Sequence, residues 1–475
     1  MGSPHTIRRR KPRYSPGVLR LLTFGPPLAG LASLCLSSPS LHAQELGDPL
    51  LDARNIGRAG TSTVSGDSGV AIVHNPAGMV RRAQSRLRLG IGIQDADLEY
   101  VSTNASSPTL TNRAAPTTLP TLAYHHGLAD GRWVLGVILR GGSSTSSLPT
   151  PAFGQPADDV ERLFPHRYAG TAYESTWRQL ALGAAVRLGD SWGLGLSVGL
   201  RDLEVREDRR IWAGFAGRDP LLGAERDLAL SIVGRDRLNP SGSVGVLYAP
   251  LALPLEFAAS AEVQAGANLS GGSASLRSTN SSEFPQVEGN SATAQTSWND
   301  RATLRGGLRY LGEQWIVEAG IDMALVQASS EERWQLTGLD VVDESTVRSS
   351  LTSAPTLHSE RSRMSIRGAV DYEALAGFLW ITGGYAWHAP STAQNKRMPA
   401  YAKLGGHRLA LGILANHEDY SLSVGYSRGF ARTRSIADLD AQQAINPFEA
   451  GTGPANAGSY RTTSDQLGFS LEVAW

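Results

Sequence analysis

Apolar and polar residues alternate with a period of two along most of the chain from residue 86 onward. In the last such segment the apolar positions are Leu467, Phe469, Leu471, Val473 and Trp475, and the positions between them are small or polar. The same pattern recurs at 86–93 and 191–200. This alternation is typical of β-strands that expose one apolar face.

The alternating segments are long for a globular protein, whose strands average about five or six residues, and match the roughly 9–11 residues that a tilted strand needs to cross a membrane. They predict fourteen strands, at 86–101, 117–128, 131–141, 173–188, 191–206, 239–249, 255–270, 297–311, 314–329, 359–373, 376–388, 405–416, 419–431 and 464–475.

The connections between these strands alternate in length. Even-numbered ones are tight, as at 188–191, 311–314 and 416–419. The odd-numbered ones are long and polar, at 102–116, 142–172, 207–238, 271–296, 330–358, 389–404 and 432–463. A soluble sandwich also alternates along its strands, but short turns on one rim and long loops on the other are typical of a bacterial outer-membrane barrel. The sequence therefore predicts an all-β fold, a 14-stranded antiparallel transmembrane β-barrel.

Aromatic residues near the ends of the predicted outward faces are expected to form interfacial girdles. They are Tyr100, Trp133, Trp177, Trp192, Tyr248, Tyr310, Trp315, Trp387, Tyr420 and Trp475.

The first 43 residues have the parts of a secretory signal, with a basic leader, an apolar stretch at 21–36 and Ala43 before the expected cleavage. This segment holds six of the 44 basic residues and no acidic residue, so the mature chain has 38 basic against 44 acidic residues and a net charge near −6. The only cysteine, Cys35, leaves with it, which excludes a disulfide framework. No apolar run in the mature chain approaches the 18 residues of a membrane-spanning helix.

Charged residues are predicted on the inward face of the wall. With Tyr310 opposite Trp315, Arg305 lies diagonal to both Glu318 and Asp322, and Arg309 lies diagonal to Glu318. These four residues predict a lumen charge network. It is either a structural set of ion pairs or a selectivity ring for solutes.

The sequence holds no catalytic constellation, and we expect no enzyme, cofactor or metal. The Gly195–Gly199 segment matches a nucleophile elbow but lies within a strand with no helix after it. His125 and His126 alternate faces and cannot bind one metal together. Spread basic residues and a negative mature charge argue against nucleic acid.

The segment before the barrel is too polar to cross a membrane. It contains three small-residue motifs, at 55–61, 66–71 and 74–79, and the last is His-Asn-Pro-Ala-Gly-Met. These motifs resemble the N-terminal hatch of the FadL-type outer-membrane transporters for long-chain fatty acids and aromatic hydrocarbons. The likeness continues at 120–124, 135–137, 166–168, 384–390 and 407–412 and covers nearly all of the mature chain.

The resemblance implies three parts: a signal peptide at 1–43, a lumenal hatch or plug at 44–85 and the barrel at 86–475. It implies a hatch role for Asn75, Pro76 and Ala77, with Gly57 and Gly60 letting the backbone pass close to the wall. Apolar residues are sparse in the long loops. The expected ligand groove there comprises Phe153, Leu163, Phe164, Ile211, Trp212 and Phe215.

The implied function is passive uptake of a hydrophobic small molecule, which passes inward when the hatch rearranges and leaves through a gap in the wall. The expected partners are outer-membrane lipid and lipopolysaccharide, and the assembly machinery that reads the aromatic C-terminus, here Trp475; the protein is expected to be a monomer. Three alternatives stay open: a general or anion-leaning porin, a barrel enzyme such as a lipase, and an adhesive barrel whose hatch never opens.

Overall fold

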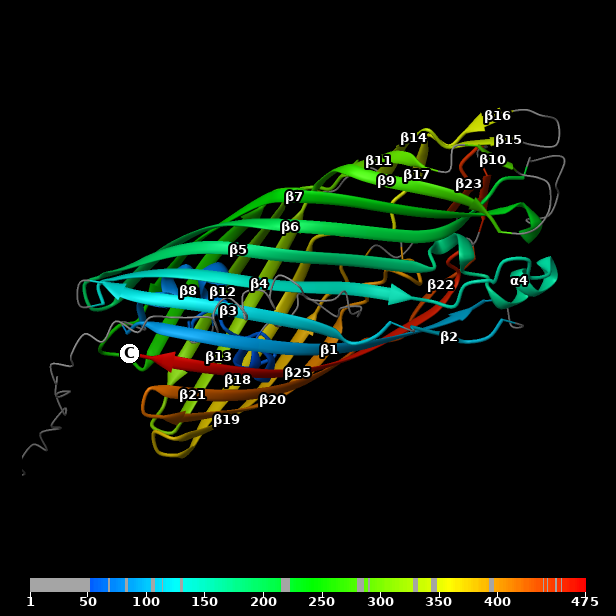
Figure 1. Cartoon of the computed structure of the whole chain (residues 1–475). Helices are drawn as coiled ribbons and strands as arrows, with labels where there is room; N and C mark the ends of the chain where they lie inside the picture. The colour runs from blue at the N-terminus through cyan, green and yellow to red at the C-terminus, as the bar shows by residue number, and fades with distance from the viewer. Residues whose placement is uncertain are drawn as a thin grey trace, which may run out of the picture.

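The computed structural model is a long closed β-barrel with a short segment of chain inside it (Figure 1). It describes residues 52–475 except for 67–68, 82–83, 104–106, 113, 129–130, 215–222, 280–285, 289–290, 328–331, 343–347, 393–396, 439, 442, 449–450 and 454. The predicted signal peptide and the first residues of the predicted hatch lie outside this range.

Fourteen strands form the wall, as predicted. They are β1 (Arg86–Ser102), β3 (Thr117–Leu128), β4 (Trp133–Ser147), β5 (Ala172–Leu188), β6 (Trp192–Trp212), β7 (Asp227–Tyr248), β8 (Leu255–Gln264), β12 (Arg301–Leu311), β13 (Trp315–Val326), β18 (Arg363–Leu375), β19 (Leu379–His388), β20 (Gly406–His417), β21 (Tyr420–Phe430) and β25 (Gly458–Ala474). Each pairs antiparallel with the next, and β1 pairs with β25 from Arg86↔Ala474 to Ser102↔Gly458, which closes the barrel.

Several strands run further than predicted on the long-loop side. The strand predicted at 131–141 continues to Ser147, and the one predicted at 239–249 begins at Asp227. The segment predicted at 255–270 is two elements, β8 and then β9 (Asn268–Ser278). The apolar alternation ends where the wall leaves the apolar belt, although backbone pairing continues beyond it, so periodicity alone underestimates strand length.

The long loops carry short elements of their own. These are β2 (Leu110–Thr111), α4 (Ala157–Leu163), η2 (Arg167–Ala169), η3 (Ala224–Arg226), β9, β10 (Gln286–Glu288), β11 (Ala292–Ser297), β14 (Arg333–Thr337), β15 (Asp340–Val342), β16 (Arg348–Ser350), β17 (Ser353–Pro355), β22 (Arg434–Ile436), β23 (Gln443–Asn446) and β24 (Gly451–Gly453). They gather at the end of the barrel where α4 is drawn, and the tight turns lie at the other end (Figure 1).

The outer surface carries an apolar belt. On β6, for example, Leu194, Leu196, Val198 and Leu200 are 42–55% exposed. Exposed aromatic side chains mark the short-turn rim of this belt, namely Trp133, Trp192, Tyr310, Trp315, Tyr420 and Trp475. Such a ring of aromatic residues is the arrangement of an interfacial girdle.

Two of the predicted girdle residues face inward instead. Tyr100 is 1% exposed and packs on Tyr460, with 5.0 Å between the ring centroids. Trp177 lies on the lumen side of β5, on the same face of the strand as Gln179. The prediction was wrong for both because the face of a residue near a strand end depends on the exact strand phase.

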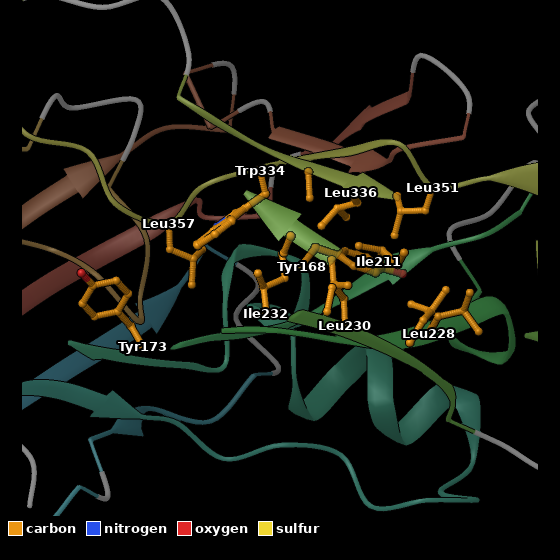
Figure 2. Close-up of a cluster of buried hydrophobic side chains, with 14 of the residues drawn as sticks. Tyr168, Tyr173, Ile211, Leu228, Leu230, Ile232, Trp334, Leu336, Leu351 and Leu357 are labelled. Atoms are coloured by element: carbon orange, nitrogen blue, oxygen red, sulfur yellow. The ribbon is translucent and has the colours of Figure 1, made fainter. Parts of the chain in front are cut away.

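The outer loops are not poor in apolar residues, contrary to the sequence-based expectation. They and the outer ends of β5, β6 and β7 form a packed apolar core around Trp334, which is 0% exposed (Figure 2). Leu230, Ile232, Leu336 and Leu357 pack in the same core. Its members come from several loops and strand ends in short stretches, such as 211–213, so no long apolar run indicates it in the sequence.

The segment before β1 lies inside the barrel. It forms α2 (Ala53–Gly57), α3 (Ala71–His74) and the 3-10 helix η1 (Pro76–Arg81). We call residues 52–81 the N-terminal segment. Helix α2 contacts β19, β20, β21, β25 and β1, whereas α3 and η1 contact strands from β4 to β8 on the other side of the barrel. No helix in the described part of the chain is long and apolar enough to cross a membrane.

Candidate functional site

Glycines of the wall let the N-terminal segment lie directly against it. A Cβ added to Gly195 on β6 would lie 2.2 Å from the backbone nitrogen of Ala77, and one on Gly425 of β21 would lie 2.1 Å from the carbonyl oxygen of Ala53. Both distances are far inside van der Waals contact. The backbone of the N-terminal segment therefore packs directly on the glycines of the inward faces of these strands. Any larger residue at these positions would push the segment away.

Buried ion pairs fix the same segment. The Arg58 guanidinium lies 2.5 Å from Glu318 on β13 and 3.4 Å from Asp371 on β18. Arg54 also reaches Asp371, at 3.2 Å. Near the end of the segment, Arg81 makes a bidentate pair with Glu256 on β8, with both N–O distances at 2.7 Å.

The Asn75-Pro76-Ala77 sequence forms a tight turn between α3 and η1. Asn75 ends α3, and its amide nitrogen donates to the carbonyl of Thr63 at 2.8 Å. Its side-chain oxygen accepts from the backbone N–H of Ala77 at 3.2 Å, as in an Asx turn. The asparagine therefore connects two parts of the segment as well as capping the turn.

The two glycines assigned to the hatch have different surroundings. Gly57 faces Gly412 of β20 so closely that an added Cβ would lie 2.8 Å from the Cα of Gly412. Gly60 follows α2 in a left-handed conformation, with φ of 87°, and its carbonyl accepts from Arg367 at 3.1 Å. Only Gly60 requires glycine for its backbone angle.

The four predicted lumen charges face inward, but their pairing differs from the predicted register. Tyr310 lies opposite Val317, which places Arg309 directly opposite Glu318 and Arg305 opposite Asp322. The tight turn is centred one residue later in the chain than expected, which shifts the register by two residues, so the diagonal pairing was wrong.

The ion pairs formed by these residues mostly involve other elements. Arg305 pairs with Glu262 at 2.6 Å, Arg309 with Glu256 at 3.6 Å and Asp322 with Arg367 at 2.9 Å. Glu318 instead pairs with Arg58 of the N-terminal segment. The network therefore joins the wall to the segment, a link that strand parity alone could not reveal.

An internal cavity of about 200 Å³ lies between the N-terminal segment, the wall and the outer loops. His74 is the lining residue that the segment supplies, and its carbonyl accepts from Ser260 at 2.6 Å. The outer loops contribute His358 and Tyr401, among others. All three parts of the molecule thus line the cavity.

The cavity lining is both charged and aromatic. Its charged residues are Arg140, Arg201, Arg301, Arg305, Lys403, Glu262, Glu332 and Glu360. Its aromatic side chains, apart from histidine, are Tyr173, Trp177, Trp298 and Tyr401. Burial opposes the ionisation of Glu360, but Lys403 and His358 outweigh it and hold the pKa of this loop carboxyl well below its usual range.

The wall loses its regular pairing beside this cavity. β3 and β4 pair from Leu128↔Trp133 to Thr121↔Arg140 and no further, while β4 continues along β5 to Ser147. Pro120 follows this last pair on β3, and a proline cannot donate to a ladder. In the stretch of β4 beyond Arg140, Gly141, Gly142 and Ser143 are all buried, so this stretch lacks the exposed face of the other wall strands.

The residues expected to form a ligand groove in the loops have different surroundings. Ile211 and Trp212 are buried in the outer apolar core, whereas Phe153 is 71% exposed. Leu163 and Phe164 are half-buried at the end of α4, and Phe215 lies outside the described residues. The cavity lies among Arg140, Arg201, Trp177 and their neighbours, which sequence reasoning missed.

The lining of the cavity is rich in charged groups. Among the described residues there is no group of three or more His, Cys, Asp or Glu side chains that could hold a metal ion. Several of the charged lining side chains form ion pairs with one another. Together the fold and the site define a β-barrel whose lumen holds its own N-terminal segment.

The fold is that of the FadL-type barrels. Three solved structures illustrate it: a Pseudomonas aeruginosa FadL homologue, with 14% identity, a TM-score of 0.68 and 92% of this chain and 99% of that chain covered; the Pseudomonas putida toluene transporter TodX, with 14% identity, a TM-score of 0.60, and 90% and 99% covered; and the Ralstonia pickettii toluene transporter TbuX, with 12% identity, a TM-score of 0.58, and 89% and 98% covered. No family model and no curated protein matches the sequence. The predicted FadL-type fold is confirmed.

Proposed function

We propose that this protein is an outer-membrane channel for the passive uptake of small hydrophobic compounds. The observation that carries the proposal is the cavity beside the point where the β3–β4 pairing ends. The apolar belt with its aromatic rim suits a bilayer. The shared fold with two toluene transporters supports the ligand class.

Residues 44–85 act in this proposal as the hatch, after removal of residues 1–43 as a signal peptide. The hatch stays seated during transport. Breaking one buried ion pair costs about 3–5 kcal/mol, and the segment makes several, at Arg54, Arg58 and Arg81. In this role Asn75, Pro76 and Ala77 hold the hatch against β6 and β7.

A route through the side of the barrel avoids this cost. A compound would enter through the outer loops, occupy the cavity and leave beside the end of the β3–β4 ladder. Arg140 forms the last pair of this ladder and Ser144 lies beyond it, and both residues line the cavity. The direct partners of the barrel are then membrane lipid and lipopolysaccharide, and the assembly machinery that recognises Trp475.

The test is uptake by cells that lack their own transporters, with and without this protein. We expect faster entry of labelled toluene or oleate and no change for a small sugar. Replacing Ser144 by Trp should reduce the hydrophobic uptake to nearly the rate of cells without the protein, because the bulky ring fills the route.

Leu135→Trp is the matched control, since Leu135 lies on the same strand but is 46% exposed on the outer belt. This variant should transport normally. Faster sugar entry alone would replace the proposal with the porin alternative. Equal uptake by the Ser144 and Leu135 variants would refute the side route.

A further inference from the structure

Three arginines from different strands meet at the cavity. On adjacent strands, Arg140 lies opposite Gln179, and Gln179 lies opposite Arg201. Arg140 Nε donates to Gln179 Oε1 at 2.6 Å. Arg301 lies opposite Gln264, whose side-chain amide is 3.0 Å from Arg201 Nε. The side-chain amides of Gln179 and Gln264 therefore lie between the three guanidinium groups along one arc of the wall.

Each acid of the lining lies beside a basic side chain. Glu262 pairs with Arg305 at 2.6 Å, Glu332 with His358 at 3.0 Å, and Glu360 with Lys403. The lining has five Arg or Lys side chains against three carboxylates, an excess of two positive charges. Arg140 and Arg301 repel the charge of Arg201, and Glu360 and Glu262 offset part of this repulsion. An anion in the cavity would relieve this repulsion, and the guanidinium fork matches a carboxylate in geometry.

The same cavity has an aromatic side. The Arg140 guanidinium lies 5.5 Å from the ring centre of Trp177. Trp298 stacks on His358, with 3.8 Å between centroids, and Tyr173 meets Tyr401 at 4.7 Å. Rings of this kind offer edge and face contacts to an aromatic guest. A long alkyl chain would gain less from them.

Size also separates the ligand classes. A dry engineered cavity of about 150 Å³ binds benzene, whereas pockets for drug-sized ligands start at about 300 Å³. The cavity here, at about 200 Å³, suits one ring with one small substituent. A neutral hydrocarbon of that size would bind more weakly than a carboxylate, because it offers no charge-assisted hydrogen bond to the arginines.

We infer that the cavity selects small aromatic carboxylates, with Arg140, Arg201 and Arg301 binding the carboxylate and Trp177 and Trp298 contacting the ring. The inference rests on the proposed function, because it names the substrate class of that route. Among the small hydrophobic compounds that could use the route, it ranks aromatic carboxylates above neutral hydrocarbons.

Equilibrium binding to the purified full chain in lipid vesicles tests it, with labelled benzoate, toluene and oleate as probes. We expect benzoate to bind more tightly than the other two. Arg201→Gln should weaken benzoate binding by at least about tenfold, the effect of losing one charge-assisted hydrogen bond, and leave toluene binding unchanged. Arg201→Lys should recover part of the loss.

Arg206→Gln is the matched control. Arg206 lies on the same strand, faces outward and is 54% exposed, so its loss should not affect benzoate. The β-sheet circular dichroism of each variant shows whether its barrel has folded. Preferred binding of toluene or oleate, or unchanged benzoate binding by a folded Arg201→Gln variant, would overturn the carboxylate inference and leave the proposed function intact. The proposed function itself fails on a different result, the absence of any hydrophobic uptake by cells with folded barrel.

Discussion

Single buried residues decide how the long loops respond to acid. His166 is 0% exposed, and its Nε2–H donates to the Pro149 carbonyl at 3.0 Å. Its ring packs against Tyr100 and Phe164. Burial lowers the pKa of this histidine from 6.5 to about 4. The folded loop therefore holds it neutral.

Loop packing around His166 should weaken at acidic pH. An exposed histidine binds a proton at about pH 6.5, whereas the folded loop binds one only near pH 4. The neutral His166 therefore contributes fully to the stability of the folded loop above about pH 6.5. This stabilisation, about 3 kcal/mol in total, is lost as the pH falls toward about 4. Hydrogen exchange of amides in loop 148–171, corrected for intrinsic rates, should show this loss of protection.

The variant His166→Phe keeps a buried ring that cannot titrate. Its loop should lose no additional protection between about pH 7 and about pH 5. If wild type and variant showed the same pH dependence, another group would be responsible.

At the scale of elements, the contact between a wall strand and the N-terminal segment depends on single glycines. Gly384 and Gly383 are neighbours on β19. A Cβ at Gly384 would lie 2.5 Å from the carbonyl carbon of Arg58, whereas a Cβ at Gly383 would meet no atom within 4 Å. The two positions therefore form a natural matched pair.

We expect Gly384→Ala to push α2 off the wall and to strain the Arg58 ion pairs, since neither backbone can yield easily. The N-terminal segment should become sensitive to protease, and a small sugar should begin to leak through the barrel. Gly383→Ala should behave as wild type in both assays. Equal protease resistance of the two variants would mean that the segment has room to shift.

The same scale shows why the sequence predicted the wall well and its connections less well. Alternation at 191–200 is set by the apolar belt, which each strand must present on its own. The pairing of Arg309 with Glu318 instead depends on the exact position of the turn between their strands. A turn that lies one residue later gives every residue of the two strands a new partner. Likewise Pro120 can be seen in the sequence, but only the strand pairing in the structure shows that the β3–β4 ladder ends beside it.

On the scale of the whole molecule, the outer loops behave as a second packed unit on top of the barrel. The buried Trp334 indole donates to Glu207 at 3.1 Å, and Glu207 also accepts from Thr356 and Leu357. The loop core is joined to the wall through the extended ends of β6 and β7. Its stability is thus separable from that of the apolar belt.

Trp334→Ala should open this loop core and leave the barrel intact. Truncating a buried tryptophan costs about 3–5 kcal/mol, and the loss falls on contacts between loops rather than on wall pairing. Limited proteolysis should cut the long loops of the variant, while the sheet signal in circular dichroism persists to the same temperature as in wild type. Phe153→Ala, at a residue that is 71% exposed, is the control and should change neither readout. Cooperative loss of loops and barrel together would contradict two separable units.

The sequence by itself determined the barrel, its strand number and the likeness of its first segment to a hatch, because each is encoded locally, in residues a few positions apart. The tertiary structure alone decided that Arg58 pairs with Glu318, that Trp334 centres an outer core, and that Arg140, Arg201 and Arg301 share one cavity. Those contacts join residues far apart in the chain. Their formation depends on which strands become neighbours and in which register, and no local pattern carries that information.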